Sequence, residues 1–389
     1  GKFLIYTPEH IAKNSTDLSN NLFLPDERLE EMQNFLVSAG DIIFPIVGTL
    51  GRAMQVNENM PCGIINQRLA KFRISSQKLN EKYFLRLFAT STFYDDYIKL
   101  QSRGSIILNL TKQILYDMPV PLPPLAEQKK ISDYLDKKCS AIDSAVDAAK
   151  KLVAKLRDYK KSLITETVTK GLNPSAEMQD SNIDWLGEIP SHWKVVPMKK
   201  YLSSIIDYRG KTPTKVDEGI FLVTARNIKD GRINYELSQE FVRKSEYNEI
   251  MHRGKPKVGD VLFTTEAPLG EVANVDKIDI ALAQRIIKFT PAENLDSYFL
   301  KYCIMSHGFQ EFLKTLSTGS TASGIKSSKI FMLKIPLPPL EEQKQIAEFL
   351  DRKCAAIDEN IFKHKQLADK LTEYKKSLIY EVVTGKMEV

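Results

Sequence analysis

The stretch PLPPLAEQKKISDYLDKKCSAIDSAVDAAKKLVAKLRDYKKSLITETVT, from Pro121 to Thr169, occurs twice in the chain. The second copy, PLPPLEEQKQIAEFLDRKCAAIDENIFKHKQLADKLTEYKKSLIYEVVT, runs from Pro336 to Thr384 at a constant offset of 215 residues. The two copies are identical at 29 of 49 positions. Solenoid repeats have units of only about 20–50 residues, so this spacing indicates the duplication of a whole domain.

In each copy, apolar residues step by four and three, which is the pattern of a narrow coiled-coil seam on a long helix. The predicted seam residues are Ile131, Leu135, Ile142, Leu152, Leu156, Leu163, Ile346, Leu350, Ile357, Leu367, Leu371 and Leu378. A Pro-Pro pair precedes each helix, and Gly171 and Gly385 mark the two ends. Each helix should therefore have about 45 residues and be roughly 68 Å long.

A lone helix cannot bury such a seam, so the two helices are expected to pack against each other. A whole domain connects them, which permits an antiparallel pairing. The predicted register sets Ile131 beside Leu378 and the small Ala149 opposite the polar Asn360. Small against polar can fix a register, although Asn360 can equally be a solvated residue.

The chain of 389 residues has room for two or three domains, and its 43% hydrophobic and 27% charged residues are globular values. A net charge of +6 permits a polyanionic partner without requiring one. No apolar run approaches the roughly 20 residues that span a bilayer. Four cysteines without CxxC spacing suit buried thiols in a reducing cytosol, and five scattered histidines give no support for a metal site.

The two segments outside the repeat resemble each other loosely. Short β-branched runs at 41–47, 220–224, 261–265 and 285–289 predict strands, and 81–101 and 296–316 predict helices that begin beside Asn80 and Asn294. The expected fold is therefore α+β, with two globular α/β domains separated by two long helices that form an antiparallel, pseudo-twofold coiled coil. The expected boundaries are 1–120 for the first domain, 121–172 for the first helix, 173–183 for a linker, 184–335 for the second domain and 336–389 for the second helix. Residues 184–218 have no counterpart ahead of Gly1, so the first domain is expected either to lack its opening strand and loop or to have them outside the given sequence.

Motifs for catalysis are scarce. The sequence has no P-loop, no glycine-rich cofactor fingerprint and no methyltransferase motif, and the ExK at Glu127–Lys129 lies on a helix without a paired strand acid. The polar and basic loops can bind DNA, because Arg recognises guanine, Asn and Gln recognise adenine, and Ser and Thr hold phosphate. The candidate DNA-binding residues are Arg52, Gln67, Arg68, Arg103, Ser105, Lys112, Arg209, Lys211, Thr212, Lys215, Arg226, Asn227, Arg232, Arg285, Thr318, Ser320, Thr321 and Lys326. Each loop can also be an ordinary solvated turn, and the Gln-Arg pairs can be structural.

Two variable domains, each followed by a helix that begins PLPPLxEQK, resemble the specificity (S) subunit of type I restriction-modification enzymes. The segment Ile189–Lys194, IPSHWK, is a further mark of that family. The resemblance implies that each domain is a target-recognition domain for one half of a split, asymmetric DNA site. It also implies that the helices set the spacer and bind two methyltransferase subunits, and that a restriction and translocase subunit joins the complex.

The resemblance further implies a chain that has no catalysis of its own and binds no cofactor, with S-adenosylmethionine in the methyltransferase subunit, inside a prokaryotic cytoplasm. Half-sites that face the same side of DNA lie roughly 10 bp apart. Two other hypotheses stay open at this point: a coiled-coil adaptor whose end domains bind protein, and a stand-alone nuclease. Salt-dependent binding to a bipartite duplex distinguishes DNA recognition from the coiled-coil adaptor. Cleavage of DNA by the isolated chain with Mg²⁺ favours the stand-alone nuclease.

Overall fold

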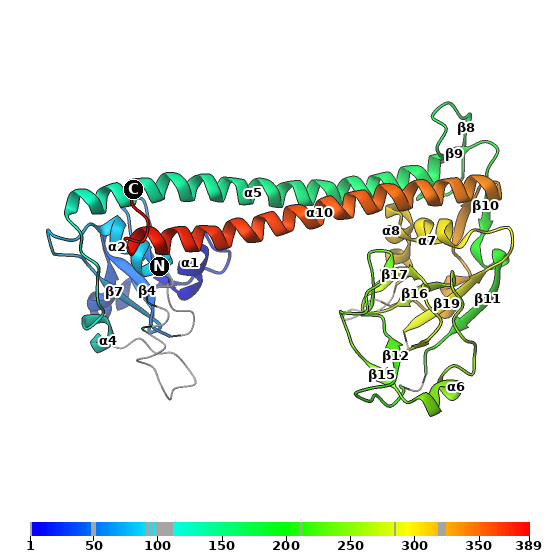
Figure 1. Ribbon diagram of the computed structural model, residues 1–389, viewed down its shortest axis with the longest axis horizontal. Helices are drawn as coiled ribbons and strands as arrows, with labels where there is room; N and C mark the ends of the chain where they lie inside the picture. Colours follow the sequence, from blue (N-terminus) through cyan, green and yellow to red (C-terminus); the bar gives the residue numbers. More distant parts are fainter. Residues whose placement is uncertain are drawn as a thin grey trace. The chain divides into compact units, whose positions relative to one another are not determined.

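The computed structural model describes residues 2–47, 52–90, 94, 97, 112–210, 212–283, 285–317 and 324–389, with the backbone alone at 89, 90, 112 and 327. The chain forms two compact units. The first comprises Gly1–Lys151 and His364–Val389, and the second comprises Leu152–Lys363. Both long helices contribute to both units, as the green and orange-to-red ribbons of Figure 1 show.

The two long helices are α5 (Leu125–Lys170), with 46 residues, and α10 (Leu340–Val383), with 44 residues. Their lengths match the prediction, and Gly171 and Gly385 follow the ends with φ of +74° and +72°. These left-handed conformations suit glycine, which ends a helix at no steric cost. The helices pack antiparallel, because the start of α5 shares a hydrophobic core with the end of α10 in the first unit, and the reverse holds in the second.

The buried row on α5 departs from a strict heptad. Buried or half-buried residues run from Ile131 to Val168 in ten steps over 37 residues, about 3.7 residues per step, whereas a heptad seam steps by 3.5. The row has therefore drifted by one position after six steps, so Val153 is buried where Leu152 was predicted. Leu152 is 38% exposed and Leu367 is 46% exposed, so their assignment to the seam is wrong.

The other predicted seam residues have two degrees of burial. Those that the structure buries are Ile131, Leu135, Ile142, Ile346, Leu350, Ile357 and Leu378. Those that it half-buries are Leu156, Leu163 and Leu371.

Two ion pairs between the helices fix a register that differs from the predicted one. In the first unit, Asp143 binds Lys375 at 2.6 Å, and in the second unit Lys160 binds Asp358 at 2.7 Å. The predicted register places residue 143 opposite residue 366 and residue 160 opposite residue 349, in both cases nine residues away, or roughly 14 Å of helix. That register is wrong. Asn360 is exposed and donates to a carbonyl of its own helix, as a solvated residue does.

The first globular domain is built on two small sheets. Its elements are β1 (Phe3–Tyr6), α1 (Pro8–Lys13), β2 (Phe23–Leu24), η1 (Asp26–Arg28), η2 (Glu30–Phe35), β3 (Leu36–Val37), β4 (Ile42–Pro45), β5 (Met54–Gln55), β6 (Gly63–Ile65), β7 (Leu69–Phe72), α2 (Glu81–Thr90) and α4 (Lys112–Tyr116). The strand orders are β2-β1-β6-β3 and β5-β4-β7, with β1 parallel to β6. Phe44 on β4 packs against Phe88 on α2, and α2 lies on the helix pair.

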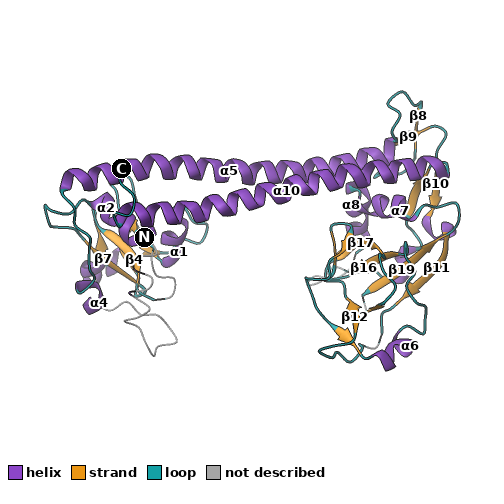
Figure 2. Ribbon diagram, viewed as in Figure 1, coloured by secondary structure: helices purple, strands orange, loops and turns teal. Residues whose placement is uncertain are grey.

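The second globular domain has more strands. Its elements are β8 (Met178–Asp180), β9 (Glu188–Pro190), β10 (Lys194–Pro197), η3 (Met198–Tyr201), β11 (Leu202–Asp207), β12 (Ile220–Val223), β13 (Ile228–Lys229), β14 (Arg232–Ile233), β15 (Phe241–Val242), η4 (Lys244–Glu246), α6 (Tyr247–Ile250), β16 (Val261–Thr265), β17 (Leu269–Asn274), β18 (Ile280–Leu282), β19 (Ile286–Pro291), α7 (Ser297–Met305), α8 (His307–Leu316), α9 (Ser327–Ile330) and β20 (Lys334–Leu337). The main sheets have the orders β11-β19-β16-β17 and β15-β12-β18. Figure 2 shows this mix of strands and short helices beneath α10.

The two domains share one topology. In both, a parallel pair (β1 with β6, β12 with β18) accompanies an antiparallel triplet (β5-β4-β7, β17-β16-β19) and a helix that packs on the long helices. Two details differ from prediction. The helix expected over 296–316 is broken by the buried Ser306 into α7 and α8, and its cap is Asp296 rather than Asn294. The part of 81–101 beyond Thr90 lies largely outside the described residues.

No helix among the described residues is long and apolar enough to cross a membrane.

Candidate nucleic-acid interface

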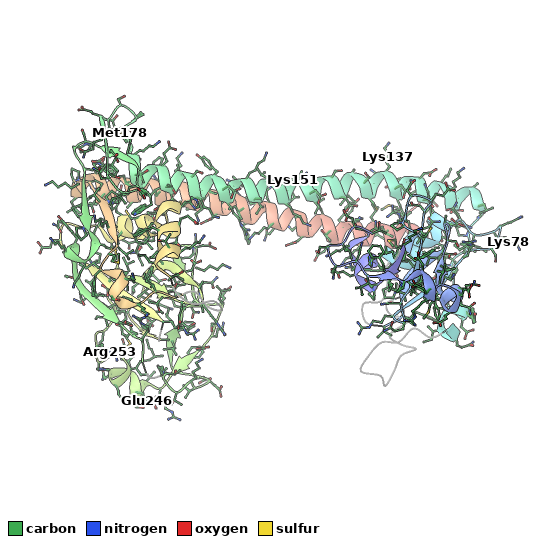
Figure 3. The ribbon with its side chains drawn as sticks, turned by 180° about the vertical axis from the view of Figure 1, so that it is seen from behind. Lys78, Lys137, Lys151, Met178, Glu246 and Arg253 are labelled. Carbon is green, nitrogen blue, oxygen red and sulfur yellow. The ribbon has the colours of Figure 1, made fainter. Side chains whose placement is uncertain are left out.

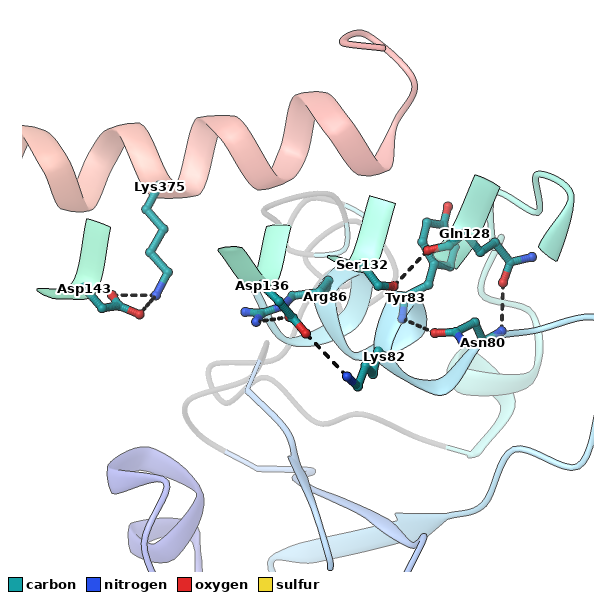
Figure 4. Close-up of polar contacts among 9 residues, drawn as sticks. All are labelled: Asn80, Lys82, Tyr83, Arg86, Gln128, Ser132, Asp136, Asp143 and Lys375. Atoms are coloured by element: carbon teal, nitrogen blue, oxygen red, sulfur yellow. Dashed lines mark hydrogen bonds and ion pairs between the residues drawn. The ribbon is translucent and has the colours of Figure 1, made fainter. Parts of the chain in front are cut away.

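One buried glutamine fixes the first domain to α5. The side chain of Gln128 accepts a hydrogen bond from the backbone N–H of Asn80 at 2.7 Å (Figure 4). The same side chain donates to the carbonyls of Lys78 and Pro123. Asn80 in turn caps α2 by accepting from the N–H of Tyr83 at 3.0 Å. Because a buried amide must satisfy its donors and acceptors, this network holds the first turn of α2 on α5.

The second domain is attached to α10 in the same way. Gln343, the repeat partner of Gln128, accepts from the N–H of Asp296 at 2.8 Å and donates to the carbonyls of Asn294 and Pro338. Asp296 caps α7 by accepting from the N–H of Phe299 at 2.8 Å. The duplicated helix therefore carries a duplicated attachment point for a globular domain.

A pair of equivalent carboxylates reinforces these attachments. Asp136 on α5 binds Arg86 of α2 at 2.6 Å, and its repeat partner Asp351 on α10 binds Lys301 and Tyr302 of α7 at 3.1 and 2.5 Å (Figure 4 shows the first pair). Burial, together with the bond to Asp351, raises the pKa of Tyr302, so its hydroxyl stays a donor at neutral pH. The carboxylate positions recur, while the partners on the domains differ.

Each long helix also carries an exposed apolar stripe. Leu152 and Tyr159 lie one heptad apart on α5 and are 38% and 56% exposed. Their repeat partners Leu367 and Tyr374 on α10 are 46% and 54% exposed. We call these two pairs the Leu-Tyr stripes. Large apolar side chains at the same exposed position of both copies are typical of a surface that another protein covers.

Two arginines of the second domain, Arg209 and Arg253, lie at its end remote from α10. Arg209 forms a fork with Asp207, with Nε 3.0 Å from Oδ1 and Nη2 2.5 Å from Oδ2, and Asp207 thereby raises the pKa of Arg209. Arg253 donates to the carbonyls of Asp207 and Arg209 at 2.6 and 2.8 Å. Figure 3 labels Arg253 beside Glu246 at this end of the domain, and the arginines line a pocket of about 300 Å³ with Thr214. Two rigidly held guanidinium groups suit the phosphates and base edges of DNA.

Arg285 lies at the start of β19 in a left-handed conformation, with φ of +75°. Its Nε is 3.0 Å from Oε1 of Glu266, which directly follows β16. Both side chains are about half-exposed, and the backbone of Glu266 bridges to Gly324 beside the loop of Lys326. Arg285 and Lys326 are thus brought to one end of the sheet, where both side chains are exposed.

Three further candidates of the second domain are exposed. Lys215 binds Glu240 at 2.8 Å, an ion pair that solvent screens. Thr212 and Arg226 lie on the surface in the loops before and after β12. These side chains can reach a ligand without unfolding the domain.

The structure contradicts one candidate and reassigns another. Asn227 is fully buried, and its Oδ1 accepts from the N–H of Thr224 at 2.9 Å while its Nδ2 donates to the carbonyls of Asn234 and Ser238. Its hydrogen-bonding groups are used inside the fold, so it closes a turn rather than recognising adenine. Arg232 is exposed but binds Asp358 of α10 at 2.8 Å, which makes it a contact between the second domain and a long helix.

Three candidates of the first domain are described. Arg52 donates to the carbonyl of Ala12 at 2.9 Å and lines a pocket between α1 and α2. Gln67 and Arg68 are exposed in the turn between β6 and β7. Arg68 occupies the turn that leads into β7, as Arg285 does before β19.

The remaining candidates lie outside the described residues. They are Arg103, Ser105, Lys211, Thr318, Ser320 and Thr321, and of Lys112, the first residue of α4, only the backbone is described.

Sequence reasoning missed the polar contacts on the long helices. Gln128, Asp136, Asp143 and Lys160 are each identical to the residue 215 positions later, although none of them was assigned to the apolar seam. Identity between the two copies at these polar positions was the available signal. Glu266 and Asp207 gave no such signal, because only the folded backbone brings them to Arg285 and Arg209.

Among the described residues, no group of three or more His, Cys, Asp or Glu side chains could hold a metal ion. Burial raises the pKa of the thiols of Cys139 and Cys354, which suits packing residues rather than nucleophiles.

The family described as Type I restriction modification DNA specificity domain matches residues 3–147 and 201–367 of the chain. These two matched stretches each cover most of one globular domain and part of a long helix. The chain belongs to this family of type I restriction-modification specificity subunits.

Relatives match over most of the chain. The type I restriction enzyme MjaVIII specificity subunit of Methanocaldococcus jannaschii is 28% identical over 339 residues, 84% of this chain and 75% of the relative. The EcoBI specificity subunit of Escherichia coli is 22% identical over 337 residues, 84% of this chain and 69% of the relative.

Solved structures agree on the fold. The HsdS subunit of Thermoanaerobacter tengcongensis gives a TM-score of 0.53 at 17% identity, covering 99% of this chain and 91% of that one. A chain from a study of complex assembly and conformational transition of the type I R-M system gives a TM-score of 0.71 at 17% identity, covering 95% and 87%. Two α/β domains and two long helices packed against each other are the shared architecture.

Membership of the family decides several points. The chain is the DNA specificity subunit of a type I restriction-modification system, a non-catalytic component that assembles with DNA and other subunits. Specificity subunits bind no cofactor, and S-adenosylmethionine is bound by the methyltransferase subunit.

Proposed function

We propose that residues 1–120 and 184–335 are two target-recognition domains, each of which binds one half of a split, asymmetric DNA site. The observation that carries this proposal is the contrast between attachment and surface. Gln128 and Gln343 hold the domains to the helices by the same bonds, while the exposed loops differ in sequence and length. Two domains that are attached to the helices in the same way but expose different loops are suited to binding two different half-sites.

The DNA contacts that we propose come from the exposed polar and basic side chains. They are Arg52, Gln67, Arg68, Arg209, Thr212, Lys215, Arg226, Arg285 and Lys326, together with Arg103, Ser105, Lys112, Lys211, Thr318, Ser320 and Thr321. Arginines would recognise base edges and hold phosphates, and the hydroxyls would hold phosphates. Arg232 is better placed to join its domain to α10 through Asp358, so it is not part of this set.

The long helices, residues 121–172 and 336–389, would set the distance between the half-sites, with 173–183 as a linker. A continuous helix of more than 40 residues is stiff, and buried packing along both copies makes the pair stiffer. Half-sites that are contacted from one side of the duplex lie roughly one turn, about 10 bp, apart.

We also propose that each Leu-Tyr stripe binds one methyltransferase subunit. The stripes have the same residue types at the same exposed positions of both copies, so the same partner surface can bind twice. A restriction and translocase subunit would join through this complex, in the cytoplasm where prokaryotic DNA lies. The partner helix should present an apolar face, because the stripes are narrow and aromatic at one end.

Exchange of residues 184–335 for those of a relative tests DNA recognition. The methylated motif in cells that carry the intact system should change in one half-site only. A change in both halves, or in neither, would contradict two independent recognition domains. If the isolated chain binds no bipartite duplex with a steep salt dependence, the alternative of a coiled-coil adaptor with protein-binding end domains is favoured.

Placing two carboxylates in one stripe tests methyltransferase binding. The double variant Leu152→Asp with Tyr159→Asp should leave the fold intact and reduce the complex from two methyltransferase subunits to one, measured by native mass spectrometry. Lys151→Asp, at an exposed α5 position (Figure 3), is the matched control and should keep both subunits. Retention of both subunits by the double variant would place the interface elsewhere.

A further inference from the structure

We propose that Glu266 positions Arg285 to recognise a guanine in the half-site that the second domain binds. The inference rests on the proposed function, because it requires the second domain to contact DNA. Glu266 directly follows β16 and Arg285 directly precedes β19, and these adjacent antiparallel strands bring the two side chains to the same end of the sheet. Glu266 is a positioning residue here, and Arg285 makes the contact.

The backbone of Arg285 is the first reason. Its φ of +75° is uncommon for any residue with a Cβ atom, and glycine would adopt it without strain. Thr265, which is buried, donates to the carbonyl of Arg285 from both its N–H at 2.9 Å and its Oγ1 at 3.2 Å. The fold thus holds a strained arginine in one conformation, and such strain is concentrated at functional sites.

The side chain supplies the second reason. Oε1 of Glu266 lies 3.0 Å from Nε of Arg285, and this contact orients the plane of the guanidinium group. A guanidinium held through Nε directs its two terminal nitrogens away from the carboxylate, and a pair of parallel N–H groups matches O6 and N7 of guanine in the major groove. Orienting the group beforehand reduces the entropy that binding would otherwise cost.

An ion pair formed only for stability explains these facts less well. Both side chains are about half-exposed, and exposed ion pairs contribute little to stability. A stabilising pair also does not require the left-handed backbone at Arg285. Glu266 itself follows a buried strand and bridges to Gly324, so the backbone places both members of the pair without the ion pair.

Arg285→Gly separates a DNA-contacting role from a structural one. Glycine relieves the backbone strain, so the melting temperature of the complex with its methyltransferase subunits should stay the same or rise. Binding to the duplex with the cognate site should fall by about 5- to 140-fold, the range for a lost bidentate contact. A lower melting temperature with unchanged binding would assign Arg285 a structural role and overturn the proposal.

Glu266→Gln and Glu266→Ala test the positioning role. Gln keeps an acceptor near Nε and should relax the methylated motif slightly, whereas Ala should relax it clearly, at the same base pair that Arg285→Lys affects. The matched control is the exposed pair Lys314 and Glu311 on α8 of the same domain, with 2.6 Å between Nζ and Oε1. Lys314→Arg and Glu311→Gln should leave that base pair fully specified, and equal relaxation by these controls would overturn the proposal.

A base analogue completes the test and separates it from the proposed function. Replacing the guanine at the affected position by 7-deazaguanine removes N7 and should weaken binding by the native complex, with no further loss for Arg285→Gly. The proposal for Arg285 would be contradicted if the second half-site contained no guanine. It would also be contradicted if the losses of affinity from 7-deazaguanine and from Arg285→Gly were additive, and in both cases the proposed function would still stand. If exchange of residues 184–335 leaves the second half-site unchanged, the proposed function itself fails.

Discussion

The two globular domains are attached to the long helices by equivalent side chains, yet their polar interiors differ. In the second domain Asp260 and Lys288 are almost fully buried and lie 2.7 Å apart, with Thr290 donating to the same carboxylate. In the first domain the equivalent Asp41 lies 3.7 Å from Lys71, which is 30% exposed. The helix residues that hold the domains have stayed the same after duplication, while the domains themselves have diverged.

This contrast separates two requirements. Attachment depends on Gln128 and Asp136 and on their repeat partners Gln343 and Asp351, which are identical in type. Recognition depends on loops such as that of Arg209, whose fork with Asp207 belongs to β11, a strand without a counterpart in the described part of the first domain. Divergence where DNA would bind and identity where the helices bind are expected of a chain that must change its target without changing its assembly.

The largest expected difference between the domains concerns the buried ion pair. Lys288→Met leaves Asp260 buried without its cation and should lower the free energy of unfolding by about 3–5 kcal/mol. Lys71→Met should cost about 1 kcal/mol or less, because Asp41 also binds Arg73 and solvent screens the pair. Urea unfolding, monitored in each domain by hydrogen exchange, measures the loss of stability in both variants. Equal losses would show that the two interiors are energetically alike.

Loss of the attachment glutamines should affect both domains equally. Gln343→Ala and Gln128→Ala each leave a buried N–H and two carbonyls without partners, so each should cost about 2–4 kcal/mol. The two tryptophans of the chain, Trp185 and Trp193, both lie in the second unit, so their fluorescence follows that unit after Gln343→Ala. Hydrogen exchange over α2 follows the first unit. A loss confined to one variant would break the equivalence of the attachments.

The drift of the buried row gives a smaller effect at two adjacent positions. Val153→Ala removes buried methyl groups and should cost about 1–2 kcal/mol. Leu152→Ala and Leu367→Ala remove exposed side chains and should change the stability by no more than about 0.5 kcal/mol. Thermal unfolding monitored by circular dichroism compares the three variants. A larger loss for Leu152→Ala than for Val153→Ala would restore the strict heptad seam.

The smallest effect is expected at the ion pairs between the helices. Asp358 binds both Lys160 and Arg232, whereas Asp143 binds Lys375 and is mostly exposed. Asp358→Asn should therefore cost about 1 kcal/mol and Asp143→Asn less than half of that, after allowance for screening by solvent. Salt titration of the melting temperature checks this, since added salt should reduce the difference. A greater loss at Asp143 would contradict the ranking.

Much of this architecture could be predicted, because the sequence contains the long helix and its neighbouring domain twice. The helix lengths, the antiparallel pairing and the α+β domains followed from the offset of 215 residues and the apolar spacing. The register did not, because apolar residues such as Leu152 and Val153 lie side by side and a difference of 0.2 residue per step accumulates slowly. The ion pair between Asp143 and Lys375 fixes the register. A search for apolar spacing does not detect it, because both residues are charged.

The site was less predictable than the fold. Residue type alone suggested Asn227 for adenine, but a short polar side chain beside a turn often bonds to its own backbone, as this one does. Arg232 was equally suited to phosphate or to carboxylate, and only the fold brings Asp358 to it. The left-handed Arg285 could not be expected, because the sequence offers neither glycine nor asparagine at that position.

The step of about 3.7 residues along the buried row has an evolutionary consequence. Three such steps are close to eleven residues, so an insertion of eleven in both helices keeps the same face inward, whereas seven turns it partly outward. Natural lengthening of the long helices should thus occur by insertions of eleven residues, each of which adds about 16 Å, or roughly 5 bp of DNA. Target sites among descendants of this subunit would then differ in gap length by discrete jumps and not by single base pairs.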